Sequence, residues 1–424
     1  MSAQTIAFPG RPERLAATDL RRQAAHWRLA AESFLDAEQF APADAWAAIE
    51  SQTGLPLRTQ LAGTVNELVA LAGQTDAAAR RASSSAAEYQ RAEQALQLLR
   101  QRYTQVETTL DFFGDAVATR TSAELKRVLQ LLDGLAHESM AMALSTARIP
   151  APPVLCYVRP GLGASILKAG IRLWSPGTIN PVAAIKIVRH NLFRPTSLFH
   201  ESGHQVAHLT GWTESMRAQL AQALADDDVL RSMWTSWASE IAADVFAFLH
   251  TGYAAVPALF DVVSDARTVM RWPLGDPHPI GWLRTRLGCA LCREAWGAGP
   301  WDDFETAVLA EYPVQRAEES VRPLLERSAR RLPELARACL YTPVPRFGGK
   351  PMTAALPPQR VSPQALGELE RALGAAAWTS SHWRTAEGIR LIALAGLREA
   401  ESAENAQQWA ARARQWMTAG PVAA

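Results

Sequence analysis

Cysteine is scarce in this chain, with 4 residues among 424. That is too few for disulfides to hold together a protein of this length. Only Cys289 and Cys292 form a C-x-x-C pair, and the second such pair that a structural zinc site of four cysteines would need is missing. We therefore predict that these two residues, together with Cys156 and Cys339, are buried packing residues.

An excess of charge of one sign is also missing, because 43 lysines and arginines stand against 42 aspartates and glutamates, for a formal net charge of +1. Binding to nucleic acid or to an anionic membrane needs a basic surface, so we expect neither partner. No run of about 18 apolar residues occurs, and residues 1–10 lack the basic and apolar segments of a signal peptide. We expect no membrane span and a cytoplasmic protein.

The composition that is present, 48% hydrophobic and 20% charged residues, is that of an ordinary soluble globular protein of two or three domains. Between Tyr89 and Phe113 apolar residues recur in alternating steps of three and four, which predicts a helix with a heptad seam. We expect it to pack against another helix of the same chain, most simply about residues 44–71, or else against the same helix of a second subunit.

Proline marks the expected domain boundaries. A helix that opens with the capping-box spacing of Thr121–Glu124 is ended by three prolines between 150 and 153. Prolines and glycines cluster again between 341 and 358, which is linker composition. The sequence thus predicts three parts: an N-terminal helical region, a central domain, and a linker with C-terminal helices, at 1–149, 150–342 and 343–424.

The sequence His200-Glu201-Ser202-Gly203-His204 is the strongest chemical signal in the chain. Apolar neighbours, Pro195 before it and Gly211 after it predict one buried helix over about 195–210. On a helix, residues four apart share a face, so His200 and His204 can converge on one tetrahedral metal ion. Glu201 leans toward the same cavity, where it can take a proton from a metal-activated water.

A third protein ligand is needed, and Glu240 is our prediction. His208 lies two turns from His200, roughly 12 Å along a straight helix, so it cannot join the same ion. Glu240 and Asp244 lie one turn apart in a second segment with helical apolar spacing, and we expect Asp244 to orient a ligand histidine. The competing carboxylates are those of Glu214 and of the acidic run 226–228, which reads as a hydrated loop or helix start.

These positions resemble the gluzincin class of zinc metallopeptidases, in which a helix with H-E-x-x-H is followed by a helix with E-x-x-x-D. The resemblance covers about residues 154–287. It implies a zincin-like catalytic domain in which zinc is bound by His200, His204 and Glu240. It also implies that Glu201 is the general base and that Asp244 supports the first histidine.

Gluzincin-like peptidases often place a late donor that steadies the oxyanion, and His278 is our candidate, with Arg284 as the substitute. A histidine between two prolines can equally serve to cap the next helix.

Three short runs rich in branched and aromatic residues predict strands before the motif: Val154–Val158, Ile171–Trp174 and Ala183–Val188. A strand that borders the cleft of a zinc peptidase can pair with an extended substrate backbone, and we expect the last run to do so. Gly161 and Gly163 match no phosphate-binding motif and read as turn residues.

The sequence therefore predicts a predominantly helical α+β protein with a small sheet. Its expected function is zinc-dependent hydrolysis of a peptide or protein substrate by a metal-activated water, with a glutamate as general base. The alternative is a non-catalytic adaptor or assembly protein, in which the N-terminal helices contact a protein partner and the zinc site is structural or vestigial.

Overall fold

The computed structural model of the protein describes residues 10–173, 179–272 and 277–419. Helices account for 74% of the described residues and strands for 4%, so the predicted predominantly helical fold with a small sheet is confirmed. The described residues divide into two compact units. The first holds those of 1–122 and 170–180, and the second holds those of 123–169 and 181–424.

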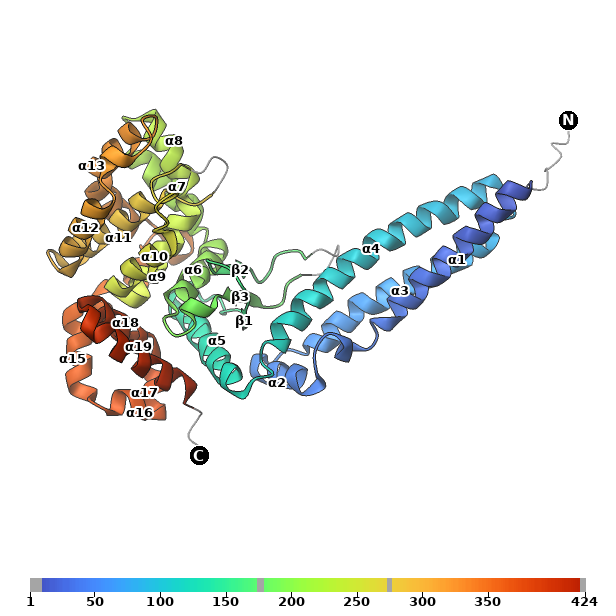
Figure 1. The fold of residues 1–424 in the computed structure, drawn as a ribbon, viewed down its shortest axis with the longest axis horizontal. Helices are drawn as coiled ribbons and strands as arrows, with labels where there is room; N and C mark the ends of the chain where they lie inside the picture. The colour runs from blue at the N-terminus through green and yellow to red at the C-terminus, as the bar shows by residue number, and fades with distance from the viewer. Residues whose placement is uncertain (1–9, 174–178, 273–276, 420–424) are drawn as a thin grey trace. The chain divides into compact units, whose positions relative to one another are not determined.

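In the first unit three long helices lie side by side (Figure 1): α1 (Arg11–Ser33), α3 (Leu57–Arg81) and α4 (Ala86–Ala118). The start of α4 is fixed by Ser85, whose Oγ accepts a hydrogen bond from the backbone N–H of Glu88. The predicted seam of α4 is buried against the other two helices at Ala92, Leu96, Leu99, Val106, Leu110 and Phe113. The seam thus has its partner within the chain.

The predicted partner segment 44–71 is two helices and not one. After the 3-10 turn Ala37–Gln39, helix α2 (Ala43–Thr53) ends at Gly54, whose φ of 66° suits glycine, and α3 begins after Pro56. Of these two helices, α3 packs along α4 as its hairpin partner, while α2 makes a smaller contact with α4.

The second unit begins with α5 (Ala123–Leu144) and the 3-10 turn Ser145–Ala147, followed by the sheet and by the 3-10 turn Arg189–Asn191. Its central helices are α6 (Thr196–Thr210), α7 (Trp212–Ala223), α8 (Asp228–Ser236), α9 (Ala238–Thr251), α10 (Ala255–Val263), α11 (Gly281–Trp296), α12 (Pro300–Glu311) and α13 (Arg322–Leu340). Further 3-10 turns cover Gly252–Ala254 and Val314–Arg316.

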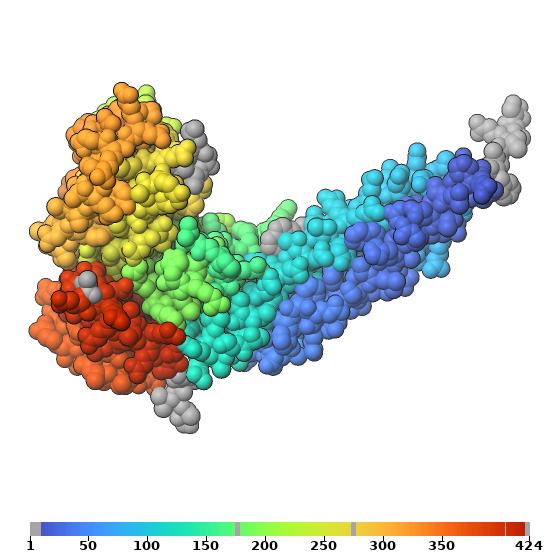
Figure 2. Space-filling model, viewed as in Figure 1, coloured from blue at the N-terminus to red at the C-terminus, as the bar shows by residue number. Residues whose placement is uncertain are grey.

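The C-terminal part of the second unit consists of short and long helices: α14 (Met352–Ala355), α15 (Pro363–Leu373), α16 (Ala376–Thr379), α17 (Ser381–Ala386), α18 (Gly388–Glu401) and α19 (Ala403–Thr418), with 3-10 turns at Pro345–Phe347 and Pro358–Val361. Figure 2 shows these red residues directly against green residues of the same unit, and α18 and α19 contact α9 and α5 respectively.

The sheet has three strands in the order β1-β3-β2. Two predicted strands are confirmed as β1 (Val154–Val158) and β3 (Ala183–Ile187), which pair in parallel. The third prediction, Ile171–Trp174, is wrong: Arg172 forms only an isolated bridge with Ile179, and Trp174 lies outside the described residues. The third strand is β2 (Ser165–Leu167), antiparallel to β3 and too short to show an alternating pattern.

This strand order corrects the prediction for the substrate-pairing strand. β3 is the middle strand and pairs with β1 on one side and β2 on the other, so its backbone is already used by the sheet. An extended peptide can join a sheet only at an edge. Of the two edge strands, β2 contacts α6, and Gly163 and Ala164 just before it line the cavity at the candidate site.

The predicted boundary near residue 150 falls instead between 122 and 123, because α5 packs on β1 and α6 of the second unit. The buried Asp133 of α5 accepts a hydrogen bond of 2.6 Å from the backbone N–H of Cys156 in β1. The expected linker near 343 also belongs to this unit, since Val344, Phe347 and Met352 are buried. Its prolines and glycines form tight turns in a packed segment.

All four cysteines are free and buried, as predicted. The helical stretch Ala238–Val263 is long and apolar enough to cross a membrane by length and composition alone. However, 67% of its most apolar window is buried inside the protein, and a core helix of a soluble protein passes the same test. The stretch is therefore no evidence of a membrane span.

Candidate metal centre

The helix α6 carries the first part of the site, as predicted. It ends at Gly211, whose φ of 71° gives the left-handed cap that stops the helix. The rings of His200 and His204 lie on one face, with their centroids 4.8 Å apart and their planes at 87°. Both rings are largely buried, with side-chain exposures of 15% and 11%. Glu201, between them in sequence, is buried and lines the neighbouring cavity.

Gly203 allows α9 to approach α6 closely. A Cβ atom at this position would lie 2.8 Å from the Cβ of Phe246 and 3.0 Å from the Cα of Ala243, which is shorter than ordinary van der Waals contact. Any larger residue would therefore push the two helices apart. The close approach brings the carboxylate of Glu240, in the first turn of α9, up to the two histidines of α6.

The three predicted ligands converge. Nε2 of His200 lies 3.4 Å from Oε2 of Glu240, and Nε2 of His204 lies 3.2 Å from Oε1. One donor atom from each residue can be chosen so that all three lie within 4.8 Å of one another. Two donors that share a tetrahedral ion at about 2 Å each are about 3.3 Å apart, so these distances fit a zinc-sized ion.

The same helix α9 also orients both imidazoles. Nδ1 of His200 lies 2.9 Å from Oδ1 of Asp244, and Nδ1 of His204 lies 3.2 Å from Oγ of Ser239. If each Nδ1–H donates to its partner, each Nε2 keeps a free lone pair that faces Glu240. The predicted orienting role of Asp244 thus has the required geometry, and Ser239 does for His204 what Asp244 does for His200.

Arg284 of α11 lies behind the ligands and is itself 7% exposed. Its Nε and Nη2 donate to Asp244 at 2.5 and 2.7 Å, and Nη2 also lies 3.4 Å from Oε2 of Glu240. We predicted Arg284 as a substitute oxyanion donor. Its contacts instead make it a positioning residue, because two of its donor groups hold the carboxylate that orients His200.

His278, the other predicted oxyanion donor, lies on the open side of the site. Its side chain is 54% exposed, its Nε2 is 3.7 Å from Oε2 of Glu240, and it lines the same cavity as Glu201. It is therefore near enough to the predicted ligands to reach a substrate bound beside them. The segment before it, including Gly275 and Asp276, lies outside the described residues.

The charges of the site favour a cation. Burial opposes a charge on His200, but the hydrogen bonds to Asp244 and Glu240 outweigh this effect and raise the pKa of the imidazole to about 10. Burial raises the pKa of the Glu201 carboxyl above its ordinary value, against the opposing effect of both imidazoles. With both imidazoles neutral, as binding of a metal ion requires, the ionised carboxylates of Glu201, Glu240 and Asp244 and the guanidinium of Arg284 carry a net charge of −2. A divalent ion would balance this charge in place of the proton that His200 otherwise holds.

The other residues that the sequence offered as metal ligands lie apart from the cluster of His200, His204 and Glu240. His208 is exposed, and neither it nor Glu214 belongs to the cluster of donor atoms. The acidic run begins α8: Asp227 accepts a hydrogen bond from the backbone N–H of Leu230, while Asp226 and Asp228 form ion pairs at the surface. The prediction that this run is a helix start is confirmed.

Two supporting residues were not identified from the sequence. One is Ser239, whose only signal is its position next to Glu240. The other is the buried Gln205, whose side-chain amide accepts from the backbone N–H of Ala169 at 2.8 Å and donates to its carbonyl at 3.4 Å. This pair fastens the segment that follows β2 to the motif helix.

Comparison of the chain with protein-family models, with curated proteins and with solved structures gives no match.

Proposed function

We propose that this protein is a zinc-dependent hydrolase of peptide bonds, of the gluzincin type in its catalytic domain. The observation that carries the proposal is the convergence of His200, His204 and Glu240, with Glu201 beside them in the wall of a cavity. Two imidazoles and one carboxylate are the donor set of catalytic zinc sites, which keep a further position open. Zinc bound there supplies Lewis acidity to the substrate carbonyl and to the attacking water.

Glu201 is the proposed general base. It follows His200 directly in α6 and is not one of the three donors, so its carboxylate is available to the reacting groups. In this role it takes the proton from the attacking water and passes it to the nitrogen of the leaving amine. Burial keeps bulk water away from this carboxylate and raises its pKa above the ordinary value, which makes it a stronger base.

His278 is the proposed donor to the carbonyl oxygen of the substrate as negative charge develops there. Its exposure on the open side leaves its ring accessible to a ligand in the cavity. A hydrogen bond aimed at this oxygen favours the transition state over the ground state. Arg284 acts indirectly, by holding Asp244 and through it the ring of His200.

The alternative function, an adaptor with helical arms, has less support. It was suggested by the heptad seam of α4, and that seam is covered by α1 and α3 within the same unit. The proposed metal site is also placed differently from a purely structural one, because its ligand His200 and the neighbouring general base Glu201 line a cavity.

Removal of the metal is the direct test. The purified full-length chain is expected to contain close to one equivalent of zinc and to cleave an unstructured protein such as casein. Dialysis against a chelator should abolish cleavage, and one equivalent of zinc should restore it, since the proposed chemistry needs the Lewis acid. Cleavage that persists in the metal-free protein would refute the proposal, as would a zinc-loaded protein that cleaves neither casein nor peptides.

Replacement of Arg284 with methionine tests its positioning role. The change leaves the largely buried Asp244 without its main partner, so we expect a loss of about 3 to 5 kcal/mol in the free energy of unfolding. We also expect zinc affinity to fall by roughly 10- to 100-fold, because His200 loses its fixed orientation. Urea denaturation and competition with a chelating dye measure the two effects.

The matched control is Arg286→Met. Arg286 lies in the same helix and pairs with the buried Glu305 at 2.6 Å, away from the metal ligands. This variant should lose stability but keep its zinc affinity. Equal losses of affinity in both variants would mean that Arg284 acts only through the stability of the fold.

A further inference from the structure

The candidate metal centre borders a large cavity of the second unit, whose lining includes the ligand His200 and the neighbouring Glu201. The cavity has a volume of about 750 Å³ and is bounded by residues of α6, α9, α10 and α11. Sites for small-molecule ligands commonly measure roughly 300 to 1,000 Å³, so this cavity has room for more than a single side chain. Most of its lining residues are apolar. Five titratable groups of the site also line it, namely those of His200, Glu201, Asp244, His278 and Arg284.

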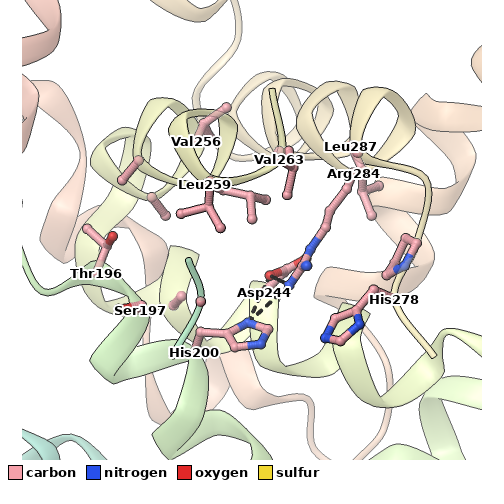
Figure 3. A pocket seen from close by; sticks show the side chains of 18 of the residues that line it. Thr196, Ser197, His200, Asp244, Val256, Leu259, Val263, His278, Arg284 and Leu287 are labelled. Atoms are coloured by element: carbon pink, nitrogen blue, oxygen red, sulfur yellow. Dashed lines mark hydrogen bonds and ion pairs between the residues drawn. The ribbon is translucent and has the colours of Figure 1, made fainter. Parts of the chain in front are cut away.

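One wall of the cavity is aliphatic. Val256, Leu259 and Val263 of α10 and Leu287 of α11 line it, across the cavity from His200 (Figure 3). Val256 and Leu287 are buried, whereas Leu259 and Val263 keep part of their surface accessible. An accessible aliphatic surface at this depth gains free energy when an apolar group covers it.

Two glycines of α11 hold this wall in place. A Cβ atom on Gly281 would lie 3.0 Å from the Cβ of Val263, and one on Gly288 would lie 3.0 Å from Cγ2 of Val256. These distances are tighter than ordinary side-chain contacts, so α11 lies as close to α10 as the backbone allows. The aliphatic wall is therefore formed before any ligand binds, which lowers the entropic cost of binding.

Polar groups lie at the ends of the cavity and not on the aliphatic wall. Thr196 and Ser197 lie at one end and His278 and Arg284 at the other (Figure 3). Oγ of Ser197 and Oδ1 of the buried Asn191, both cavity residues, have no hydrogen-bond partner within the described part of the chain. Both atoms are closed off from solvent, so the polar contacts of a substrate would come from the accessible groups at the two ends of the cavity.

We propose that the substrate is a peptide with a large aliphatic or aromatic side chain next to the cleaved bond, and that this side chain rests on the wall formed by α10. The inference depends on the hydrolase function proposed above and adds the substrate class. Leu259 is the specificity-determining residue, because it is the accessible aliphatic side chain in the middle of the wall. Small residues leave the wall uncovered and are poor substrates.

The test uses the zinc-loaded full-length chain and a series of peptides that differ at one position next to the cleaved bond, with Gly, Ala, Leu or Phe. We expect kcat/KM for the Leu and Phe peptides to exceed that for the Gly peptide by roughly 10- to 200-fold. The variant Leu259→Trp fills the cavity and should lower kcat/KM for the Phe peptide at least tenfold, with little change for the Gly peptide. Mass spectrometry of the products identifies which residue faces the wall.

Two further variants make the result specific. Leu259→Ala enlarges the cavity and should reduce the preference for Leu over Ala while keeping that for Phe. Val229→Trp is the matched control, because Val229 is 49% exposed on α8 and does not line the cavity. Circular dichroism confirms that each variant is folded. Equal rates for all four peptides in the wild type, or an unchanged preference in both folded Leu259 variants, would overturn the inference and leave the hydrolase proposal intact.

Binding provides a readout that does not depend on catalysis. The same peptides, labelled with a fluorophore, are titrated into the zinc-loaded Glu201→Gln protein. Tighter binding of the Phe peptide than of the Gly peptide, lost in Glu201→Gln/Leu259→Trp, supports the inference even if the wild type hydrolyses none of them, a result that would refute only the hydrolase proposal. Equal binding of all peptides overturns the inference.

Discussion

Replacement of Glu201 with glutamine is expected to lower the rate of peptide hydrolysis by roughly 10²- to 10⁴-fold. Glutamine has nearly the same shape but cannot accept a proton from water at neutral pH. Glu201 contributes none of the three converging donor atoms, so the variant should keep close to one equivalent of zinc. Steady-state kinetics on a fluorogenic peptide, together with metal analysis of the same sample, measure both quantities.

The matched control for this variant is Glu214→Gln. Glu214 is an exposed glutamate in the first turn of α7, and it was the competing carboxylate from the sequence. The control should hydrolyse the peptide at the wild-type rate. Hydrolysis by Glu201→Gln within a few-fold of the wild type would exclude Glu201 as general base, whereas loss of both zinc and activity would place it among the ligands.

Replacement of His204 with alanine is expected to remove most of the bound zinc and all measurable hydrolysis. The change deletes one of the two nitrogen donors and leaves His200 and Glu240, and two protein ligands are too few for a stable zinc site. The expected zinc content after dialysis is close to zero, against close to one equivalent in the wild type.

His208→Ala is the control in the same helix. His208 lies one turn beyond His204, is exposed, and falls outside the group of converging donors. This variant should keep both zinc and activity. A loss of zinc in His208→Ala equal to that in His204→Ala would show that the ion is bound in another way than the geometry of α6 and α9 indicates.

The chemistry-bearing helices could be predicted from sequence because their signals are local. The spacing of His200 and His204, the stop at Gly211 and the pair Glu240 and Asp244 each depend on residues within one or two turns. The pairing of the two helices required one further inference, that a carboxylate pair one turn apart faces a histidine pair. That inference is met by contacts of 2.9 to 3.4 Å in the structure.

Features set by distant contacts were not predictable in this way. Strand β2 consists of Ser165–Leu167, has no alternating pattern, and is a strand because it pairs with β3. Helix α5 looked like part of the N-terminal region, but it shares the buried core with β1, and its Asp133 accepts a hydrogen bond from the backbone of Cys156, 23 positions later in the chain. Likewise, the sequence around Arg284 does not reveal that its guanidinium binds Asp244, 40 positions earlier in the chain.

The aliphatic wall of the cavity is another feature that the sequence alone did not predict. Val256, Leu259 and Val263 have the spacing of an apolar helix face, and such a face usually lies in the core. Only the positions of α6 and α11 leave part of this face open toward the metal centre. The residues that determine substrate specificity are therefore harder to predict from sequence than the catalytic residues. They depend on which apolar surface the rest of the fold leaves uncovered.

All three converging donors, and the partners of both imidazoles, come from only two helices, α6 and α9. His200 and Asp244 are 44 positions apart in the chain. An ion held at this junction would tie the two segments together like a cross-link, and unfolding would have to release it. At free zinc a hundredfold above the dissociation constant, the folded form gains about 2.7 kcal/mol by mass action. Supply of the metal would thus govern not only turnover but also how long the protein survives in the cell.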